Sequence, residues 1–459
     1  MFKTQYRRPR RHTGSPYWMR SPTAYRLRKA FLTPAGLVTA VAATVILVVG
    51  IVLLLSGGGG EKKRQPRAFE ALGYSSAQVY HSPQTPGQTA FVGAWIMPDG
   101  SLMTSFTQAT GPFTGRERAP KYLQKVLYDA GYAHDPSGAK GLIDPKWDFW
   151  GLKLSVIYLR STDGGRTWKR FRTDPFRAAY PAGYTNPSTI ALRDGSILRS
   201  VNGYDLLNDT SVPHTAFLQR LAPGAKSWSA PQVLVDPSRS MYQVSRIRRL
   251  SDGRLIAIGD SRQYPAPTNA QIAAGTYDFK RMRAAPSSKL LMVSSDEGRT
   301  WTDALTVPPS ERRLTDEWDA AELPNGDLLA AFRVPDPKAT GRNLRYQAIL
   351  KKGDGGWTMS NLRRSPFPSS GHPELLAVRG GPILYVDTNG VWYTDDAGDT
   401  WLRLPGAHKT RYYPRSVQAA DGTVYVLSHV GGDYWYGEGD ESIQLQRFRV
   451  AQLPVPSKN

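Results

Sequence analysis

Hydrophobic and polar residues divide the chain into two very different parts. No charged residue occurs from residue 31 to residue 60, and residues 37–55 are an almost unbroken run of Val, Ile, Leu and Ala. As a helix, such a run is long enough to cross a hydrocarbon core of about 30 Å. After residue 67 the apolar runs become short and are separated by Gly, Pro, Asp and Asn, a pattern typical of short strands joined by turns.

The first part predicts a single membrane anchor. A cleaved signal peptide would have a shorter apolar region, of about 7–15 residues, and a small-residue cleavage site, whereas SGGGG follows here. Residues 1–29 carry nine Lys or Arg and no acid, which predicts that they remain cytoplasmic. We therefore expect a basic cytoplasmic tail (1–30), a transmembrane signal anchor (31–56) in the cell membrane, a flexible linker (57–67) and an extracytoplasmic domain (68–459).

The second part is built from repeats. Six segments each contain an apolar strand, a tight turn that is usually Asp-Gly or Asn-Gly, and a second apolar strand, with turns near residues 99, 194, 252, 325, 380 and 421. Such segments predict β-hairpins. Closing six four-stranded units around an axis protects most strand edges. The sequence thus predicts an all-β fold, a six-bladed β-propeller, whose last blade is completed by the segment SAQVYH at 76–81.

A second motif follows each of the first five hairpins. The segments 161–168, 294–301 and 394–401 fit S/T-x-D-x-G-x-T-W, and two weaker relatives end at Trp228 and Trp357. We call these five segments the Trp turns. We expect the Ser/Thr hydroxyl and Asp carboxylate to bind the local backbone, Gly to adopt a positive φ, and Trp to pack against the neighbouring unit.

The three complete Trp turns resemble the Asp boxes, or BNR repeats, of the sialidase (neuraminidase) superfamily, whose members are six-bladed propellers. The resemblance covers residues 75–450. It implies a sialidase-like glycoside hydrolase that acts on extracytoplasmic glycans, including the option of a sugar other than sialic acid. Because these repeats also occur in propellers without enzymatic activity, the alternative is a non-catalytic propeller that binds a carbohydrate or a protein.

The first strand of each hairpin is expected to line the central channel, so that equivalent positions face one another. Eight residues before the turns stand Phe91, Asn186, Val244, Glu317, His372 and Tyr413. Six residues before them stand Gly93, Ser188, Arg246, Asp319, Glu374 and Arg415. Eight residues after them stand Thr107, Asn202, Asp260, Arg333, Thr388 and His429. Polar groups at these positions indicate a site rather than an apolar core, unless the channel is simply filled with water.

Two segments resemble the catalytic motifs of sialidases. Residues 316–333 are similar to the segment that carries the catalytic Glu and one substrate-binding Arg, which fall on Glu317 and Arg333. The segment from residue 411 is similar to the one with the nucleophilic tyrosine, which falls on Tyr413, with Tyr412 as second choice. The resemblance implies that Glu317 takes the phenolic proton and Tyr413 attacks the anomeric carbon. A neutral nucleophile suits an anionic sugar, which a carboxylate would repel.

Both key residues also have a purely structural interpretation. Glu317 would then form a surface ion pair with a nearby arginine, and Tyr413 would be part of the packed channel wall.

The chain departs from the sialidase pattern at two arginines. Residues 91–94 read Phe-Val-Gly-Ala where the first-blade arginine is expected, and residues 387–390 read Asp-Thr-Asn-Gly where the third is expected. Substitutes from other blades are Arg246, Arg411 and Arg415. Without converging guanidinium groups the bidentate grip on a carboxylate is lost.

The remaining candidates have less specific signals. For the general acid we consider Asp260 and Asp319, and Asp144 or Asp148 from an insertion at about 108–152. Further substrate-binding candidates are Asn186, His372 and His429 by their position in the channel. In the insertion, Trp147 and Trp150 would either stack on sugar rings or pack the insertion onto the propeller.

Composition removes several function classes. The chain has no Cys, which excludes a disulfide scaffold, a zinc–thiolate site and a cysteine nucleophile. No metal-ligand spacing or cofactor motif is found, so neither a metal nor a cofactor is predicted. Of the net charge of +21, residues 1–29 contribute nine and residues 61–67 a net three, which leaves nine on the rest. This mild remainder argues against nucleic acid and leaves a glycan and the membrane as expected partners.

Overall fold

The computed structural model describes the chain from residue 67 onward, and the predicted anchor and linker lie outside the described residues apart from Arg67. The described residues are 67–85, 87–112, 114–124, 148–176, 188–201, 214–307, 314, 317–336, 338, 343–367, 371–431 and 441–454. Within this part of the chain no helix is both long and apolar enough to cross a membrane.

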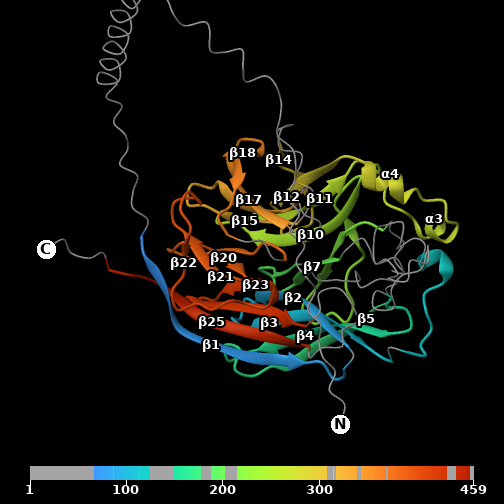
Figure 1. Ribbon diagram of the computed structural model, residues 1–459, viewed down its shortest axis with the longest axis horizontal. Coiled ribbons are helices and arrows are strands. Elements are labelled where there is room, and N and C mark those ends of the chain that lie inside the picture. Colours follow the sequence, from blue (N-terminus) through green and yellow to red (C-terminus); the bar gives the residue numbers. More distant parts are fainter. Residues whose placement is uncertain are drawn as a thin grey trace, which may run out of the picture. The chain divides into compact units, whose positions relative to one another are not determined.

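Six sheets follow one another around a common centre (Figure 1). Blade 1 contains β2 (Gln88–Ile96), β3 (Leu102–Thr110), β4 (Lys153–Ser161) and β5 (Lys169–Phe176). Blade 2 contains β6 (Thr189–Ala191), β7 (Ile197–Val201), β8 (Phe217–Leu221) and β9 (Gln232–Val233). Blade 3 contains β10 (Ser240–Arg249), β11 (Leu255–Arg262), β12 (Ser287–Ser294) and β13 (Thr302–Asp303). Blade 4 contains β15 (Trp318–Glu322), β16 (Leu328–Pro335), β17 (Asn343–Gly353) and β18 (Gly356–Arg364). Blade 5 contains β19 (Leu375–Ala377), β20 (Ile383–Asp387), β21 (Gly390–Thr394) and β22 (Leu402–Arg403). Blade 6 contains β23 (Tyr412–Gln418), β24 (Thr423–Val430) and β25 (Ser442–Gln452). The predicted six-bladed propeller is confirmed.

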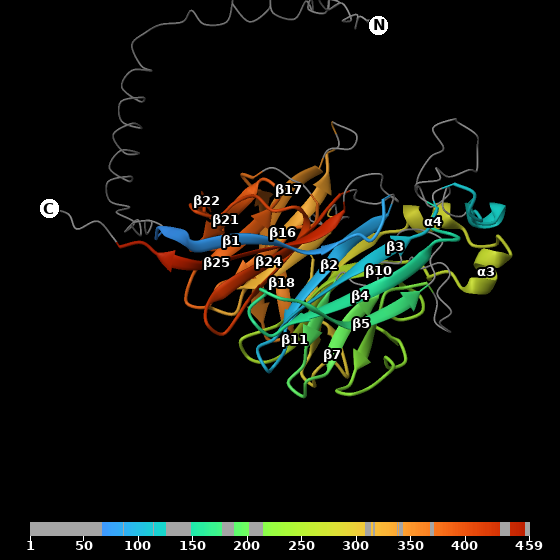
Figure 2. The ribbon, with the colours of Figure 1, turned by 90° about the horizontal axis from the view of Figure 1, so that it is seen from below.

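The ring is closed by a strand from the beginning of the described chain. β1 (Phe69–His81) pairs with β25, so blade 6 has the order β1-β25-β24-β23. Figure 2 shows the two strands side by side. The expectation that the segment around residue 80 completes the last blade is therefore confirmed. Because blade 6 combines both ends of the described chain, opening the ring requires breaking this sheet.

Strand β4 shows why the sequence reads as short apolar runs. The side chains of its alternate residues pack in two different cores. Ile157 and Leu159 pack with blade 6, while Val156 and Tyr158 pack with blade 2. A middle strand of a blade is covered on both faces, so it needs a continuous apolar run rather than simple alternation. Burial of each such side chain contributes roughly 1.5–3 kcal/mol.

The complete Trp turns have the expected geometry. In the turn of blade 3, Gly298 N–H donates to Ser294 Oγ (2.8 Å) and Thr300 N–H donates to Asp296 Oδ1 (2.9 Å). Gly298 has φ +82°, and Trp301 Nε1 donates to its carbonyl (3.1 Å). Trp301 packs in the core between blades 2 and 3. These local bonds fix the orientation of Trp301, which then joins two blades.

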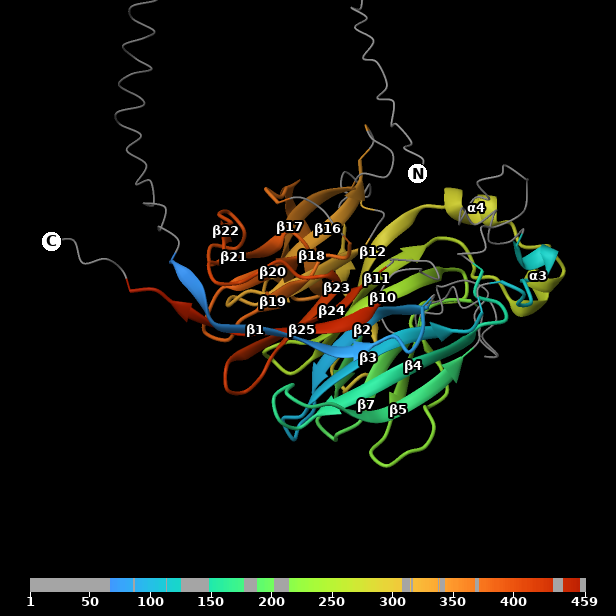
Figure 3. The same cartoon turned by 60° about the horizontal axis from the view of Figure 1, so that its bottom comes forward.

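Three details differ from the predicted regular pattern. Blade 4 gains a fifth strand, β14 (Leu305–Thr306), which runs parallel to β18. The insertion is shorter than expected, because β3 extends to Thr110 and β4 begins at Lys153. Two short helices, α3 (Asn269–Ala273) and α4 (Phe279–Ala284), lie between β11 and β12 and stand outside the ring of sheets (Figure 3).

Candidate active site

The topology brings the candidate residues to one end of the channel. Each innermost strand runs toward its Asp-Gly or Asn-Gly turn, so the residues at its beginning share the opposite end, which we call the site end. Glu317, His372 and Tyr413 precede or begin innermost strands of blades 4, 5 and 6. The insertion of blade 1 and helices α3 and α4 connect second to third strands, so they also lie at the site end. The other end, with the hairpin turns, is the turn end.

Arg333 joins the predicted base to the predicted nucleophile. Its Nη1 lies 2.8 Å from Glu317 Oε2 and donates to the phenolic oxygen of Tyr413 at 3.4 Å. The backbone supports this pairing, because Arg333 N–H donates to Glu317 O (2.8 Å). The alternative of an ion pair for Glu317 holds, but the pair is not on the surface, because Glu317 is only 7% exposed.

Tyr413 owes its orientation to an unusual backbone. Its φ of +46° lies in the left-handed region that non-glycine residues seldom adopt, and it sits where the register between β23 and β24 shifts. Such bulges redirect a side chain, and strained backbone of this kind often occurs at functional sites. The ring stacks on His429 (centroids 5.9 Å apart) and meets Phe91 edge-on (5.6 Å), and Phe91 also has a positive φ of +60°.

Below this pair lies a buried network of ions. Asp319 accepts bonds from Arg248 Nε (3.1 Å) and Nη2 (2.6 Å) and lies 3.6 Å from Arg246 Nε. Glu374 pairs with Arg246 and, at 3.5 Å, with Arg415 Nη1. It also accepts hydrogen bonds from the backbone N–H (2.7 Å) and the hydroxyl (2.5 Å) of Ser416. Each buried carboxylate is therefore held by guanidinium groups of other blades.

The charges in this network shift the pKa values of its members. Burial, together with repulsion by Arg415, lowers the pKa of Arg246 well below its usual value. Burial lowers the pKa of Arg415 to about 10. Burial opposes ionisation of Asp319, but Arg248 and Arg246 outweigh it, so the pKa of Asp319 lies below its usual value. Asp319 is thus a fixed carboxylate, and it does not suit the expected role of general acid.

His372 is a neutral imidazole beside this network. Burial, followed by the charges of Arg415, Arg246 and Arg333, holds the pKa of His372 well below its usual value. Its Nδ1 lies 2.5 Å from Pro373 O, so this nitrogen carries the proton, and Arg415 Nη1 approaches at 3.2 Å. Within the described chain Nε2 has no hydrogen-bond partner. Arg415 is thus the arginine that contacts His372, the charges of Arg246 and Arg333 act on it as well, and Nε2 is left as an acceptor.

His429 is likewise neutral and fully buried. Burial lowers its pKa to about 3. Its ring lies against those of Tyr413, Phe91 and Tyr412, and neither ring nitrogen has a hydrogen-bond partner among the described residues. Its contact with the predicted nucleophile is therefore through the ring face.

Asp260 is placed near the site through a neighbouring hydrogen bond. Trp318 Nε1 donates to Gly259 O (2.8 Å). Because Asp260 follows Gly259 and Glu317 precedes Trp318, the two carboxylates belong to the same end of adjacent blades. Asp260 accepts a bond from Lys289 Nζ (2.6 Å), and its side chain is 15% exposed. Of the two acid candidates that lie on channel strands, Asp260 is the more exposed, because Asp319 is fully buried.

Other candidates lie elsewhere. Arg411 is exposed and its Nε donates to Gln444 on β25 (3.3 Å), so it does not join the guanidinium cluster. Tyr412 is 39% exposed, which leaves Tyr413 as the tyrosine that contacts Arg333.

Asp148 joins the two described ends of the insertion to each other. This buried carboxylate binds Arg118 Nε (2.5 Å) and the backbone N–H groups of Ala119 (3.0 Å) and Trp150 (3.0 Å). Phe149 packs against Ala109 in a small core. Phe149 therefore packs the insertion onto the propeller, and the bonds of Asp148 remove this residue as a proton donor. Asn186, Trp147 and Asp144 lie outside the described residues.

Sequence reasoning missed two members of the network as site residues. Glu374 occupies an equivalent channel position, and Arg248 follows Arg246 by two residues on the same face of β10. The equivalence of positions was the available signal for Glu374. Toward the turn end the channel widens into a cavity of about 370 Å³ lined by all six blades, and Arg246 and Arg248 reach it. The network therefore lies between this cavity and the site end.

The part of the chain described by the structure contains no group of three or more His, Asp or Glu side chains placed to hold a metal ion.

Comparisons with known proteins give a likeness in fold. No family model matches the chain, and no curated protein matches it. A solved structure of a Dyadobacter fermentans protein of unknown function has a TM-score of 0.50 and 18% identity, over 83% of this chain and 100% of that one. The similarity is one of fold alone. An α-L-arabinofuranosidase from Fusarium graminearum (TM-score 0.49, 12% identity) is matched over 82% of this chain and 97% of its own. A Trypanosoma rangeli sialidase has a TM-score of 0.43 and 13% identity, over 82% of this chain and 59% of that one.

Proposed function

We propose that the protein is a sialidase-like glycoside hydrolase with Tyr413 as nucleophile and Glu317 as base. The observation that supports this most directly is the position of Arg333, whose Nη1 contacts both the Glu317 carboxylate (2.8 Å) and the Tyr413 hydroxyl (3.4 Å). A packed channel wall needs neither a strained tyrosine backbone nor a charged group at its hydroxyl.

The chemistry follows from this geometry. As Glu317 takes the phenolic proton, Tyr413 Oη forms a bond to the anomeric carbon, and the bond from that carbon to the leaving oxygen breaks. The guanidinium of Arg333 stabilises the negative charge that develops on the phenolic oxygen. Water then attacks the same carbon and gives a proton to Asp260, while Glu317 returns its proton to the phenolic oxygen of Tyr413 as the bond to the sugar breaks. The configuration of the sugar is therefore retained.

Asp260 is the proposed general acid. It is the partly exposed carboxylate of the two candidates, and Trp318 connects its segment to that of Glu317. Asp319 is assigned to holding Arg246 and Arg248 in place. An Asp260→Asn variant should lose activity on glycosides with poor leaving groups while it retains activity on aryl glycosides, whose leaving oxygen needs little protonation.

The charge of the site supports an anionic sugar as substrate. Arg246, Arg248, Arg333 and Arg415 provide four guanidinium groups, whereas Glu317, Asp319 and Glu374 provide three carboxylates. His372 is neutral, so one net positive charge remains in a buried environment. A carboxylate on the substrate would balance it.

The test is hydrolysis by the full-length protein, purified in mild detergent, against a panel of fluorogenic glycosides that includes a sialoside, hexuronides and neutral sugars. We expect turnover of an acidic glycoside, abolished in Tyr413→Phe and Glu317→Gln. If a well-folded protein turns over no member of the panel but binds immobilised glycans, the non-catalytic alternative replaces this proposal.

The membrane anchor at 31–56 is also part of this proposal, because its length and the nine flanking positive charges support it. Protease added outside intact cells should then digest the propeller of the full chain and spare the first thirty residues. A chain recovered from the medium without detergent would contradict this arrangement.

A further inference from the structure

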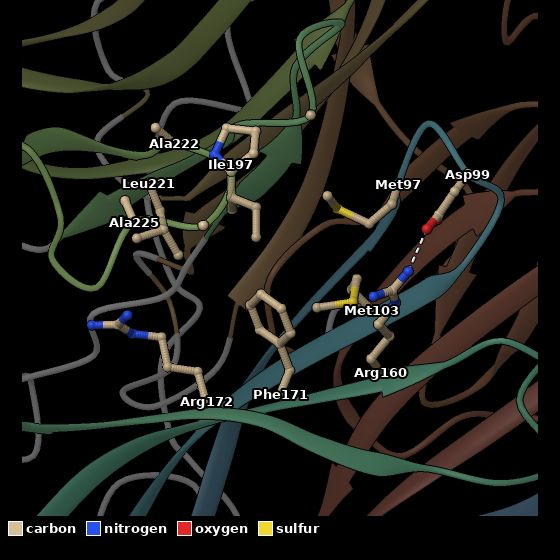
Figure 4. Close-up of a pocket in the computed structure, with 13 residues that line it drawn as sticks. Met97, Asp99, Met103, Arg160, Phe171, Arg172, Ile197, Leu221, Ala222 and Ala225 are labelled. Carbon is tan, nitrogen blue, oxygen red and sulfur yellow. Dashed lines mark hydrogen bonds and ion pairs between the residues drawn. The ribbon is translucent and has the colours of Figure 1, made fainter.

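A groove at the turn end separates blades 1 and 2. It has a volume of about 390 Å³, and its apolar lining includes Met97, Met103, Phe171, Ile197 and Leu221. Figure 4 shows the ring of Phe171 between the two methionines and the side chains of blade 2. Phe171 is 44% exposed, a large value for an aromatic side chain. This apolar surface lies at the end of the propeller opposite the candidate active site.

The groove is lined on one side by the degenerate Trp turn of blade 2. In blade 1 the fifth residue of the turn, Gly165, has φ +81° and lies so close to Leu445 of blade 6 that a Cβ would be 2.5 Å from it. Gly298 of blade 3 approaches Leu198 of blade 2 in the same way, with a Cβ distance of 2.9 Å. The complete turns therefore seal the junction with the preceding blade.

Blade 2 lacks this close glycine contact, although Trp228 packs against the core between blades 1 and 2. Its turn has Leu221, Pro223 and Ala225 where the complete motif has Ser or Thr, Asp and Gly. Ala225 does not adopt a positive φ, and its N–H binds Ala222 O (3.0 Å) instead of a side-chain hydroxyl. Trp228 Nε1 binds Asp174 on β5 (2.7 Å) rather than a carbonyl of its own turn. Of the two methionines that line the groove, Met97 is half-buried, whereas Met103 is buried.

A β-bulge turns Phe171 into the groove. Arg170 pairs with Leu159 and Arg172 pairs with Tyr158, so Phe171 is the extra residue of β5. Bulges of this kind redirect a side chain and are seldom accidental. Both Phe171 and Arg172 line the groove although they are consecutive in the strand.

The rim of the groove is basic. Arg160 and Arg172 line it, and Lys169 pairs with Arg160 on the same face of the sheet. The acids nearby are already bound: Asp99 pairs with Arg160, and Asp174 is shared by Arg172 and Arg199. In the described part of the chain neither Lys169 nor Lys226, which is exposed in the turn of blade 2, forms an ion pair.

We propose that this groove binds an acidic peptide segment that places one large apolar side chain against Phe171 and Met97. The apolar lining of the groove would bind the apolar side chain of the peptide, and the basic rim would favour acidic residues on either side of it. A flat anionic bilayer fits less well, because Phe171 points into a concavity instead of protruding from the surface. A second copy fits less well too, because its β5 would bring Lys169 and Arg170 against like charges.

The test uses the full-length protein in mild detergent and the fluorescein-labelled peptide Asp-Glu-Leu-Phe-Glu-Asp, followed by fluorescence polarisation. We expect saturable binding that weakens with salt. Phe171→Ser and Lys169→Glu should each raise Kd at least tenfold. The matched control is Leu402→Ser, since Leu402 is similarly exposed (38%) but lies on blade 5. Because Phe171 and Lys169 are both exposed, these variants should remain folded.

Three outcomes would overturn the proposal. The first is equal binding of the charge-reversed peptide Lys-Lys-Leu-Phe-Lys-Lys. The second is equal binding of the labelled acidic peptide by wild type and Phe171→Ser. The third is binding to phosphatidylserine vesicles that depends on Phe171 while the peptide fails to bind, which would make this face a membrane contact. None of these results depends on glycosidase activity.

Discussion

Arg333 Nη1 lies 3.4 Å from the hydroxyl of Tyr413, although the two residues are 80 positions apart and belong to blades 4 and 6. The same nitrogen holds the Glu317 carboxylate at 2.8 Å. Since blade 5 lies between blades 4 and 6 in the ring, this contact joins two blades that are not adjacent. It connects the residue that would take a proton with the one that would give it up.

Removal of Arg333 should reveal how much the protein depends on this contact for stability. In Arg333→Met the buried Glu317 loses its ion-pair partner, which should lower the free energy of unfolding by about 3 kcal/mol. In the double variant Arg333→Met/Glu317→Gln most of this loss should be recovered, because no buried charge remains. Chemical denaturation of the single and double variants measures both values. A single variant as stable as wild type would show that Glu317 is adequately solvated.

Tyr413→Phe should abolish turnover without unfolding the propeller. The change removes one oxygen and keeps the ring that stacks on His429, so stability should change little. If Tyr413 is the nucleophile, kcat on an accepted glycoside should fall by roughly 10³-fold or more. Tyr412→Phe, at the exposed neighbour, is the matched control and should retain activity. The opposite pattern would move the nucleophile to Tyr412.

The buried histidines predict an acid-sensitive fold. Burial lowers the pKa of His429 to about 3, whereas an unfolded histidine titrates near 6.5. Below about pH 6.5 the unfolded state therefore binds more protons, and the stability from this residue declines as the pH falls toward 3, by at most about 1.4 kcal/mol per pH unit.

His429→Phe should remove this share of the pH dependence. Thermal unfolding between pH 7 and pH 4 provides the measurement. His408→Gln, at an exposed histidine, should leave the profile unchanged. His372 acts in the same direction, so some decline should persist in the His429 variant. A wild-type profile that is flat over this range would mean that His429 is protonated at little cost.

The glycines of the Trp turns should matter through packing as well as through φ. Gly165 and Gly100 have nearly equal φ angles (+81° and +82°), but a Cβ at Gly165 would meet Leu445 at 2.5 Å whereas one at Gly100 has nothing within 4 Å. Gly100→Ala should therefore cost about 1–2 kcal/mol from backbone strain. Gly165→Ala should cost roughly 1–3 kcal/mol more, because it separates blades 1 and 6. Equal losses in the two variants would argue against a sealing role.

The sequence by itself determined the number and order of the blades. Hairpins and Trp turns are local: an Asp-Gly turn or a Gly298 with positive φ is specified by residues next to each other, so the pattern could be read directly. The strand that closes the ring could be predicted too, because the six repeats leave the last blade with three strands and the segment around residue 80 supplies the fourth. The local patterns did not specify β14, whose place depends on pairing with β18 some fifty residues later.

Only the tertiary structure decided which polar residues share a site. Channel positions identified Arg246, Arg333 and Arg415 as candidates, but the combined effect of their charges on the pKa of His372 depends on residues from three blades. Likewise, Asp319 and Asp260 looked equivalent in the sequence. The fold buries Asp319 between two arginines and leaves Asp260 partly exposed beside a lysine. Long-range electrostatics and burial have no local signature, because they depend on residues that come together only when the ring closes.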